Sequence, residues 1–486
     1  MADDQSADWA VQERGHFWWA DEVLPERYPN RPASAVTGEL KITREGRITL
    51  DLDGVLAGQD QLLPVNTREE FDAIRARCIR GVLRSRGRGV LLFDLAQTGT
   101  RVAATQCLIS DQPFAGGFEK PVFSQIDADL KGFEQWLWER ALTFKYGKVV
   151  STAKYRKPKP IVYRLQRGRL TLEQYLRGRS EGLSDITWSE AAFLRFEPDE
   201  AIGLEAAVEW HRWFQDLMIL LTDSDYRLEW PEVRWGEHYC TLYFSWLASR
   251  AERPRIHECP TNFPQIRDIF GALFEKWLSV RETYGPGIYL YLGTRRGMQL
   301  YTENQFTTLV SGLEGFHRTK YGVGKLESVV KKVERIVNQI TAKKDKKWAE
   351  SQLSYSTSPN LEARIFELVE GLALGFDKTR LRTFAKSCAT LRNLLLHGES
   401  DRTTTYTEFT TSVQKKNNAL RPLCHSLALV EIGLDPAMVR AWAVEKPQAY
   451  LRKWYFAEAG LIDHANPNDR PEDRAPTAKT SNTPVP

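Results

Sequence analysis

The sequence predicts an α+β protein of several domains, in which a β-rich N-terminal sandwich or barrel precedes a mixed middle region and an all-α C-terminal bundle. Up to residue 165, short runs of alternating apolar and polar residues are separated by turns, as in strands. From residue 300 the apolar residues recur with helical spacing. The length of 486 residues also exceeds one ordinary core. We expect domains at 10–165, 166–295 and 296–462, and a disordered tail over 463–486, which is rich in Pro, Asn, Asp and Thr.

The composition excludes several classes of protein. A net charge of +4 gives no global field that would attract nucleic acid, so any such contact must rest on local patches. The six cysteines are scattered without metal-type spacing, which favours free thiols in a reducing cytoplasm. The acidic start, MADDQSAD, is no signal peptide, and no apolar run is long enough to cross a membrane. We expect a cytoplasmic protein without membrane contact, cofactor or metal.

Two hairpins dominate the N-terminal region. Residues 36–43 and 48–52 alternate around a turn that contains Gly46, and residues 89–95 and 101–109 do so around Gly99. Further strands are expected at 118–126, 142–149 and 160–165, with a helix at 68–79. Bulky aromatic residues in this region are expected to serve core or rim packing; they are Trp18, Trp19, Trp136 and Trp138.

The most basic stretch is 154–179, which holds nine Lys or Arg residues. Tyr155, Tyr163 and Tyr175 are interleaved with them, and only Glu173 opposes them within the stretch. Basic charge with aromatic rings suits single-stranded RNA. A solvated strand edge protected by lysines explains the same pattern.

The middle region mixes helix and strand. Helices are expected at 205–221 and 266–284, with a strand at 239–247 between them. His211, on the aromatic-rich first helix, is expected to be structural. The pairs His238/Cys240 and His257/Cys259 lack a standard zinc spacing, so we expect no metal there.

The C-terminal region reads as an antiparallel helical bundle. Its expected helices are 302–321, 326–340, 360–374 with Asn360 as the N-cap, 381–397 and 413–433. Between the second and third lie a solvated lysine cluster at 343–347 and a loop at 351–359.

The fourth helix ends in a leucine-rich run that contains Arg392, Asn393 and His397. Asn393 and His397 are four residues apart and share a face, while Arg392 lies about 100° round the axis. An imidazole for proton transfer, a guanidinium for phosphate and an amide to orient either one suit phosphodiester chemistry. Taken alone, the pair of Arg392 and His397 fits equally a helix end that is capped or salt-bridged.

A helical bundle whose penultimate long helix carries Arg392-Asn393-Leu-Leu-Leu-His397 resembles the HEPN ribonucleases, whose motif is Arg, four to six residues, then His. The first bundle helix, with Phe306, Leu309 and Leu313-Glu314, resembles that of the ApeA-type subgroup. The N-terminal GHFWW at 15–19, VTGEL at 36–40 and ITLDLDG at 48–54 resemble the β-rich domain that precedes HEPN in ApeA proteins, which defend bacteria against phage by abortive infection. The region 166–295 resembles no module that we can assign.

The resemblance implies a metal-independent endoribonuclease that cleaves RNA, with tRNA as the expected substrate, and leaves 2′,3′-cyclic phosphate and 5′-OH ends. His397 would be general base or acid, Arg392 would hold the scissile phosphate, and Asn393 would orient the imidazole or contact RNA. The family pairs two bundles at one cleft, so we expect a homodimer. The N-terminal region is expected to restrain the nuclease until a phage-derived trigger is sensed.

Three alternatives stay open. Glu314 either joins the site or forms a surface salt bridge, and we favour the salt bridge. Some HEPN proteins are non-catalytic RNA-binding or dimerisation partners, but retention of Arg392, Asn393 and His397 argues for activity. A nucleotidyltransferase-linked or carbohydrate-binding protein lacks support, because the chain shows no Gly-rich phosphate loop and no paired carboxylates.

Overall fold

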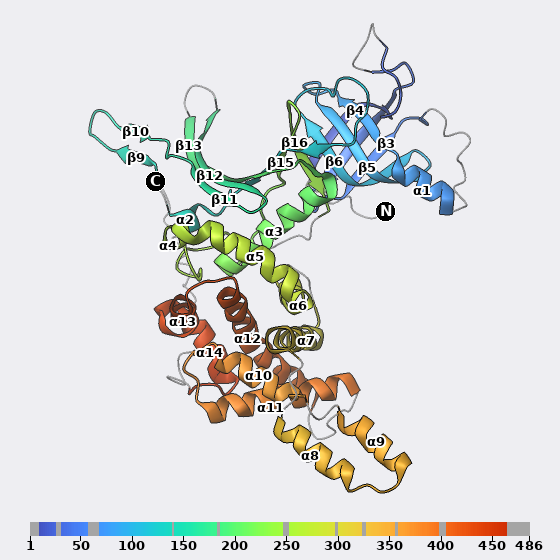
Figure 1. The fold of residues 1–486 in the computed structure, drawn as a ribbon. Coiled ribbons are helices and arrows are strands. Elements are labelled where there is room, and N and C mark those ends of the chain that lie inside the picture. The colour runs from blue at the N-terminus through green and yellow to red at the C-terminus, as the bar shows by residue number, and fades with distance from the viewer. Residues whose placement is uncertain are drawn as a thin grey trace. The chain divides into compact units, whose positions relative to one another are not determined.

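The computed structural model describes residues 9–25, 31–56, 68–138, 140–181, 185–245, 252–296, 300–322, 327–354, 358–397 and 405–463. The chain divides into two compact units (Figure 1). Unit 1 comprises residues 1–219, 224–256 and 262–275, and unit 2 comprises 220–223, 257–261 and 276–486. Within the described ranges no helix is long and apolar enough to cross a membrane.

A closed barrel of six strands forms the first part of unit 1, in the order β1-β2-β3-β6-β5-β4. Its strands are β1 (Trp9–Trp19), β2 (Val36–Thr43), β3 (Ile48–Leu52), β4 (Ile79–Leu83), β5 (Gly89–Thr98) and β6 (Arg101–Ser110). The alternation in β3 sends Ile48, Leu50 and Leu52 inward, where they join Phe17 and Leu40 in the core. Because β5 pairs with β6 along its other edge, the ring closes and the predicted sandwich or open barrel is resolved as a closed one.

A second run of strands continues from β6. Its outer half, from Gln106 to Ser110, pairs with β16, while its inner half, from Arg101 to Ala104, pairs with β3. The sheet then extends in the order β16-β15-β8-β13-β12-β11. These strands are β8 (Gln125–Asp129), β11 (Ile161–Leu165), β12 (Gly168–Glu181), β13 (Asp185–Pro198), β15 (Glu232–Trp235) and β16 (His238–Phe244), and two small two-stranded sheets pair β7 (Val122–Phe123) with β14 (Ile202–Gly203) and β9 (Leu142–Lys145) with β10 (Thr152–Tyr155).

One face of this sheet is covered by helix. Helix α3 (Leu204–Thr222) places Trp210 on Phe196 of β13, with ring centroids 3.7 Å apart. His211, also on α3, is fully buried, and desolvation lowers its pKa to about 3, so it is neutral and structural as predicted. The remaining helices of unit 1 are α1 (Arg68–Ala76), α2 (Glu134–Leu137), α4 (Phe263–Ile266) and the start of α5 (Phe270–Tyr284).

Both predicted hairpins are present as β2–β3 and β5–β6. Other details in unit 1 differ from the predictions. The helix expected at 68–79 ends at Ala76, because Ile79 already pairs in β4. The strand expected at 118–126 is broken into β7 and β8, and α5 begins after a separate turn of helix at α4. Trp138 is 59% exposed, whereas Trp18, Trp19 and Trp136 are buried.

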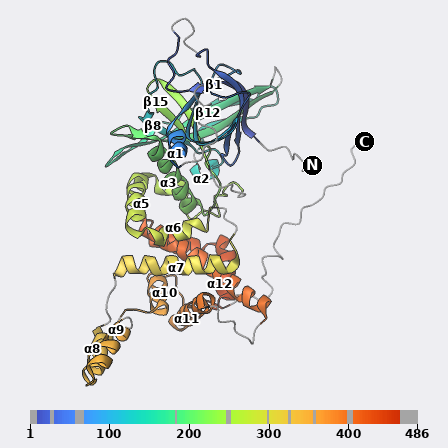
Figure 2. The same cartoon turned by 90° about the vertical axis from the view of Figure 1, so that its right-hand side faces the viewer.

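Unit 2 is helical (Figure 2). Its elements after α5 are α6 (Pro286–Gly293), α7 (Thr302–Tyr321), α8 (Glu327–Asn338), α9 (Lys343–Ser354), α10 (Leu361–Glu370), α11 (Lys378–His397), α12 (Tyr406–Glu431), α13 (Pro436–Arg440) and α14 (Tyr450–Glu458). Helix α7 packs against α6, α10, α11 and α12, so it is the central helix of the unit. Its stripe of Phe306, Leu309, Leu313 and Phe316 is buried, which is the periodicity that predicted it.

The helix boundaries in unit 2 differ modestly from those predicted. Asn360 does cap α10, accepting a 2.8 Å hydrogen bond from the Ala363 amide, but the helix stops at Glu370 and not at 374. The lysine cluster at 343–347 opens helix α9, which continues to Ser354 through part of the expected loop. Helix α12 begins at Tyr406, where Thr405 forms a capping box that sequence reasoning missed. The expected tail beyond residue 463 lies outside the described residues.

Candidate functional site

The last two turns of α11 carry the predicted motif. Arg392 is partly buried, with 28% of its side chain exposed, and Asn393 is exposed. The Arg392 guanidinium lies 3.5 Å from Asn393 Oδ1, at the limit of a hydrogen bond. His397 closes the helix, five residues on, but its side chain lies outside the described residues. The structure thus places the backbone of all three predicted residues on one helix and the side chains of two.

Glu314, in the middle of α7, links this motif to the neighbouring helices. One of its carboxylate oxygens accepts from Arg318 at 2.7 Å and from Arg364 at 2.9 Å. The other lies 3.7 Å from the Arg392 guanidinium. Glu314 therefore forms salt bridges, which is the alternative that we favoured from the sequence, and one of them reaches Arg392 of the predicted site. Three guanidiniums from α7, α10 and α11 converge on it.

Burial makes the members of this arginine cluster (Arg318, Arg364 and Arg392 around Glu314) unequal. Arg364 is 7% exposed, and its Nε donates to the Pro359 carbonyl at 2.9 Å. Desolvation, followed by repulsion from Arg318, lowers the pKa of Arg364. Arg318 is 56% exposed, and the buried Arg392 Nε has no hydrogen-bond partner among the described residues. With three guanidiniums and one carboxylate, the cluster carries a net charge of +2 and can accept an anion such as a phosphate.

Leucines beside the motif are incompletely covered. Leu391 faces the core, but Leu394 and Leu395 are half-buried and Leu396 is 54% exposed. The sequence suggested polar groups set among buried leucines. The structure instead shows that, at the end of α11, Asn393 and Leu396 are exposed and Leu394 and Leu395 are half-buried.

A histidine that sequence reasoning passed over lies near Glu314 in the chain. His317 of α7 is buried, and its Nε2 is 2.7 Å from the Glu367 carboxylate on α10. Its ring also packs on Tyr321 at 4.8 Å. These contacts tie α7 to α10 and give His317 a structural role beside the arginine cluster.

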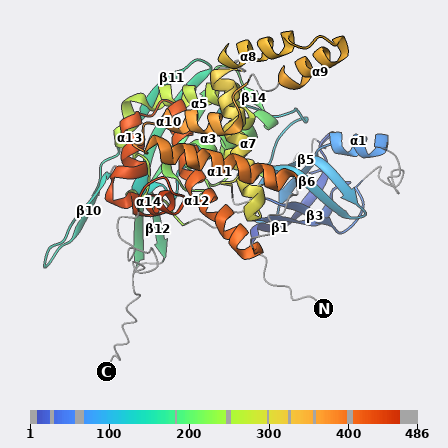
Figure 3. The same ribbon diagram turned by 90° about the horizontal axis from the view of Figure 1, so that it is seen from below.

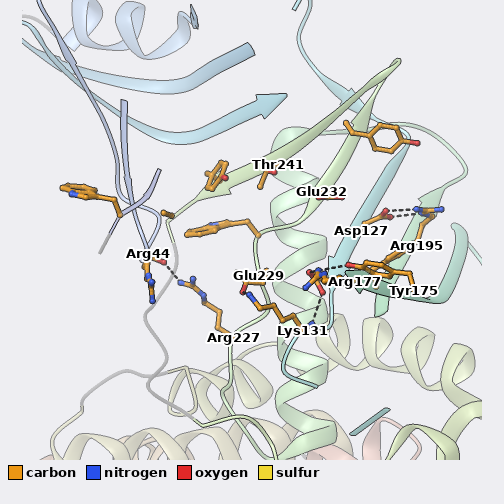
Figure 4. Close-up of a pocket in the computed structure, with 17 residues that line it drawn as sticks. Arg44, Asp127, Lys131, Tyr175, Arg177, Arg195, Arg227, Glu229, Glu232 and Thr241 are labelled. Carbon is orange, nitrogen blue, oxygen red and sulfur yellow. Dashed lines mark hydrogen bonds and ion pairs between the residues drawn. The ribbon is translucent and has the colours of Figure 1, made fainter. Parts of the chain in front are cut away.

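Unit 1 contains a second polar region, a cavity of about 1020 Å³ on the face of the sheet opposite α3 (Figure 4). Its charged residues pair across the strands. Asp127 accepts from Arg195 Nε at 3.0 Å and from its terminal nitrogen at 2.9 Å, and Lys131 lies 3.1 Å from Glu229. Burial raises the pKa of Asp127 despite this pairing. Five basic and four acidic side chains line the cavity, so the charges largely cancel and leave a surplus of one positive charge.

The same pairing revises the interpretation of the basic stretch 154–179. Lys157 binds Glu173, Arg164 binds Asp199, Arg169 binds Glu197 and Arg177 binds Asp129. Three of these four carboxylates lie outside the stretch, Glu197 on β13, Asp199 just after it and Asp129 on β8, so the apparent excess of positive charge is partly neutralised in the fold.

Metal-ligating side chains do not gather in the described ranges: no group of three or more His, Cys, Asp or Glu residues could hold an ion. The six cysteines are free and buried, and burial raises the pKa of Cys388 and Cys240 to about 12. These thiols are therefore protonated and unreactive at neutral pH.

Comparison with protein families decides the assignment. Residues 13–277, more than half of the chain, match the family described as ApeA N-terminal domain 1. The chain belongs to the ApeA family. Residues 307–437 match the ApeA-like HEPN domain, and this segment contains α10, α11, Glu314 and the whole arginine cluster. The chain has no significant match among curated proteins or among solved structures.

For an ApeA family member, the HEPN match supports a nuclease of anti-phage defence at the level of the family. The two matches together confirm the predicted resemblance to an ApeA-type protein with a C-terminal HEPN domain. The ApeA N-terminal match also covers residues 166–277, which the sequence alone left unassigned. Arg364 was missed because only the packing of α10 on α7 brings it to Glu314, 50 residues away in the chain.

Proposed function

We propose that this ApeA family protein is an anti-phage endoribonuclease that acts through Arg392, Asn393 and His397 on RNA, with tRNA as the first candidate substrate. The observation that carries the proposal is the arginine cluster. Arg392 is held at the surface of the helical unit next to two further guanidiniums, and it lies five residues from His397 on the same helix. A net charge of +2 on a helix that also carries His397 in its sequence suits a phosphodiester that accumulates negative charge as it reacts.

The chemistry is a transesterification that needs no metal. A general base takes the proton of the ribose 2′-OH, the 2′-oxygen forms a bond to phosphorus, and the bond from phosphorus to the 5′-oxygen breaks. A general acid gives that leaving oxygen a proton, which yields a 2′,3′-cyclic phosphate and a 5′-OH. Arg392 stabilises the charge on the non-bridging oxygens. His397, in the last turn of α11, lies at the negative end of the helix dipole, which favours its protonated, acid form.

Two proton-transfer groups are needed, and one α11 supplies one histidine in this motif. We therefore propose that the protein acts as a homodimer through its helical unit, with two motifs facing one cleft. The strip of Leu394, Leu395 and Leu396 supports this assembly, because apolar side chains beside the motif would be covered by a second copy. The proposal includes restraint by the ApeA N-terminal domain until a phage-derived trigger binds, which keeps uninfected cells intact.

RNA end analysis tests the activity. Wild type and His397→Ala are expressed in bacterial cells that are then infected with phage, so that the proposed trigger is present, and new RNA ends are sequenced after treatments that distinguish cyclic phosphate from other 3′ ends. His257→Ala is the matched control, since this histidine is 52% exposed and lies outside the motif. We expect cleavage by wild type and by the control, and none by His397→Ala. Equal cleavage by His397→Ala would refute the assignment.

A non-catalytic HEPN protein is the second candidate. The contact of Arg392 with Glu314 favours it, because a helix-to-helix ion pair explains Arg392 without any chemistry. In that case wild type would bind RNA or dimerise without producing new ends, and Arg392→Ala would alter stability alone.

A further inference from the structure

The hairpin β9–β10 projects from the sheet of unit 1 (Figures 1 and 3). Residues 140–160 contain seven basic residues and no Asp or Glu. These are Arg140, Lys145, Lys148, Lys154, Arg156, Lys157 and Lys159. Lys157 pairs with Glu173 of β12, whereas Lys145, Lys148 and Lys154 are exposed and contact no carboxylate in the described ranges. Residues 140–160 therefore keep a surplus of positive charge, whereas the arginines at 164, 169 and 177 are paired with carboxylates.

The strand register separates two kinds of side chain on the hairpin. Phe144 lies opposite Ala153, and Lys145 lies opposite Thr152, so aromatic and basic residues point to opposite faces. The Phe144 and Tyr146 rings are 53% and 86% exposed and stack nearly parallel, with centroids 6.3 Å apart and planes at 15°. Large aromatic rings that are exposed in this way have open faces on which another ring can stack.

A small pocket of about 250 Å³ lies at the foot of the hairpin. Trp138, Arg140 and Tyr155 line it from the two ends of the hairpin, and Gln174 lines it from β12. Its volume is below that of a drug-sized site and suits one planar ring system. The Tyr155 hydroxyl and Gln174 Oε1 are buried without hydrogen-bond partners among the described residues. Such buried polar atoms are costly unless something satisfies them.

The start of the hairpin is fixed in place. The Glu190 carboxylate on β13 accepts hydrogen bonds from the backbone amides of Ala141 and Leu142. Trp138, just before it, is the C-cap of the short helix α2 and has a left-handed backbone with φ of 53°. The foot of the hairpin, where the pocket lies, is therefore held by β13. Tyr155 pairs with Leu142 and shares the face of Phe144, whereas Lys145 and Lys154 lie on the other face, so a strand that contacts both faces must pass over the edge of the hairpin.

We propose that the hairpin β9–β10 and the pocket at its foot bind a single-stranded segment of RNA, with the lysines on its phosphates, the exposed rings on its bases, and one unstacked base in the pocket. The surplus of basic charge on the hairpin supplies affinity for phosphate, and aromatic faces supply stacking that tolerates any base. Glu134 and Glu190 also line the pocket, which therefore takes a base and not a phosphate. The unpartnered Tyr155 hydroxyl and Gln174 Oε1 give hydrogen-bonding capacity for a base edge. The choice of RNA over DNA rests on the proposed ribonuclease function.

Binding of a short fluorescent single-stranded RNA to the full-length chain, measured by anisotropy in rising salt, tests this. All proteins carry His397→Ala, so that the RNA stays intact. We expect the triple variant K145Q/K148Q/K154Q to reduce the slope of log affinity against log salt by about 2, from about 0.7 per phosphate contact. We expect F144A/Y146A to weaken binding by about fivefold to a hundredfold.

The matched control is K343Q/K344Q/K347Q, which removes the same charge from exposed lysines of α9. It should leave the salt slope within error of the parent. Trp138→Ala tests the pocket, and we expect weaker binding with an unchanged salt slope, because a stacking surface and not a charge is lost. All these side chains are exposed, so far-ultraviolet circular dichroism and Tm should stay those of the parent.

The proposal would be overturned if the hairpin triple and the control triple reduced the salt slope equally, or if F144A/Y146A bound RNA as tightly as the parent. It would also be overturned if the hairpin bound anionic lipid vesicles in place of RNA. The exposed Val149 and Val150 at the tip of the hairpin make lipid a specific alternative. Equal affinity for single-stranded DNA of the same sequence would overturn the choice of RNA. Failure of the ribonuclease proposal is distinguishable, because it would leave hairpin-dependent binding intact while wild type makes no new RNA ends.

Discussion

Replacement of Glu314 by alanine tests whether this residue holds the site together. The substitution removes the only carboxylate that Arg364 contacts in the described part of the chain, and Arg364 is 7% exposed. Loss of one partner from a buried pair costs about 3–5 kcal/mol, and the lower end applies here because Glu314 itself is 22% exposed. We expect the free energy of unfolding of the helical unit to fall by about 3 kcal/mol. For a unit of this size, that corresponds to a drop in Tm of about 6–12 °C.

Arg318→Ala is the matched control. Arg318 contacts the same carboxylate at 2.7 Å, but it is 56% exposed and pairs within one helix, so its loss should cost about 0.5 kcal/mol or less. Thermal unfolding followed by far-ultraviolet circular dichroism compares the two variants with wild type. The reasoning fails if Glu314→Ala lowers Tm no more than Arg318→Ala does.

A double-mutant cycle separates the arms of the cluster. Glu314→Ala combined with Arg364→Ala should be less destabilised than the sum of the two single variants, because the second substitution removes the unpaired buried charge that the first creates. Glu314→Ala combined with Arg392→Ala should be nearly additive, since that contact is long, at 3.7 Å. Additivity in the first pair would show that Glu314 does not stabilise Arg364.

Other predictions concern pH, capping and the motif. His425 is fully buried, and burial lowers its pKa to about 4, below the unfolded value near 6.5. The free energy of unfolding should therefore be highest above pH 6.5 and should fall by up to about 3 kcal/mol as the pH drops toward 4. In His425→Gln, chemical denaturation should show a smaller decrease between these two pH values. Asn360→Ala should cost about 1 kcal/mol by removing the cap on the Ala363 amide, and Asn360→Asp should restore it in the same unfolding assay. Arg392→Lys should keep the charge but lose the planar geometry, lowering the RNA cleavage rate about tenfold to a thousandfold while Tm stays within 2 °C or so of wild type.

The sequence predicted those features that depend on local pattern. Alternation gave the hairpins β2–β3 and β5–β6, and helical periodicity gave α7 and α11, since both follow from side chains a few residues apart. Strands β12 and β13 were missed although both are long. In β12, Leu170 and Leu172 alternate with Arg169 and Thr171, which is the period of a strand. The stretch was interpreted by its charge, and this alternation was not used.

Pairings between distant segments could not be predicted. The closure of the barrel requires β5 and β6 to share an edge while β6 passes from β3 to β16, and no residue in β6 signals that change of partner. The arginine cluster is of the same kind. Glu314, Arg364 and Arg392 lie on three helices, and their convergence depends on packing of α10 and α11 against α7. A short sequence motif can identify the helix that carries the predicted site, but it cannot predict which charged residues of other helices pack beside that helix.

The net charge of the arginine cluster can be compared with the charge of the phosphate in the proposed reaction. A phosphodiester carries one negative charge, and the pentacoordinate transition state of its transesterification carries two, so a site that stabilises the second more than the first accelerates the step. Three guanidiniums around a single carboxylate leave a net charge of +2, which matches the transition state and exceeds the ground state. Glu314 then does two things at once. It offsets the repulsion that would otherwise separate Arg318, Arg364 and Arg392. On the proposed function, by neutralising only one of them it would also leave a charge surplus for the reacting phosphate.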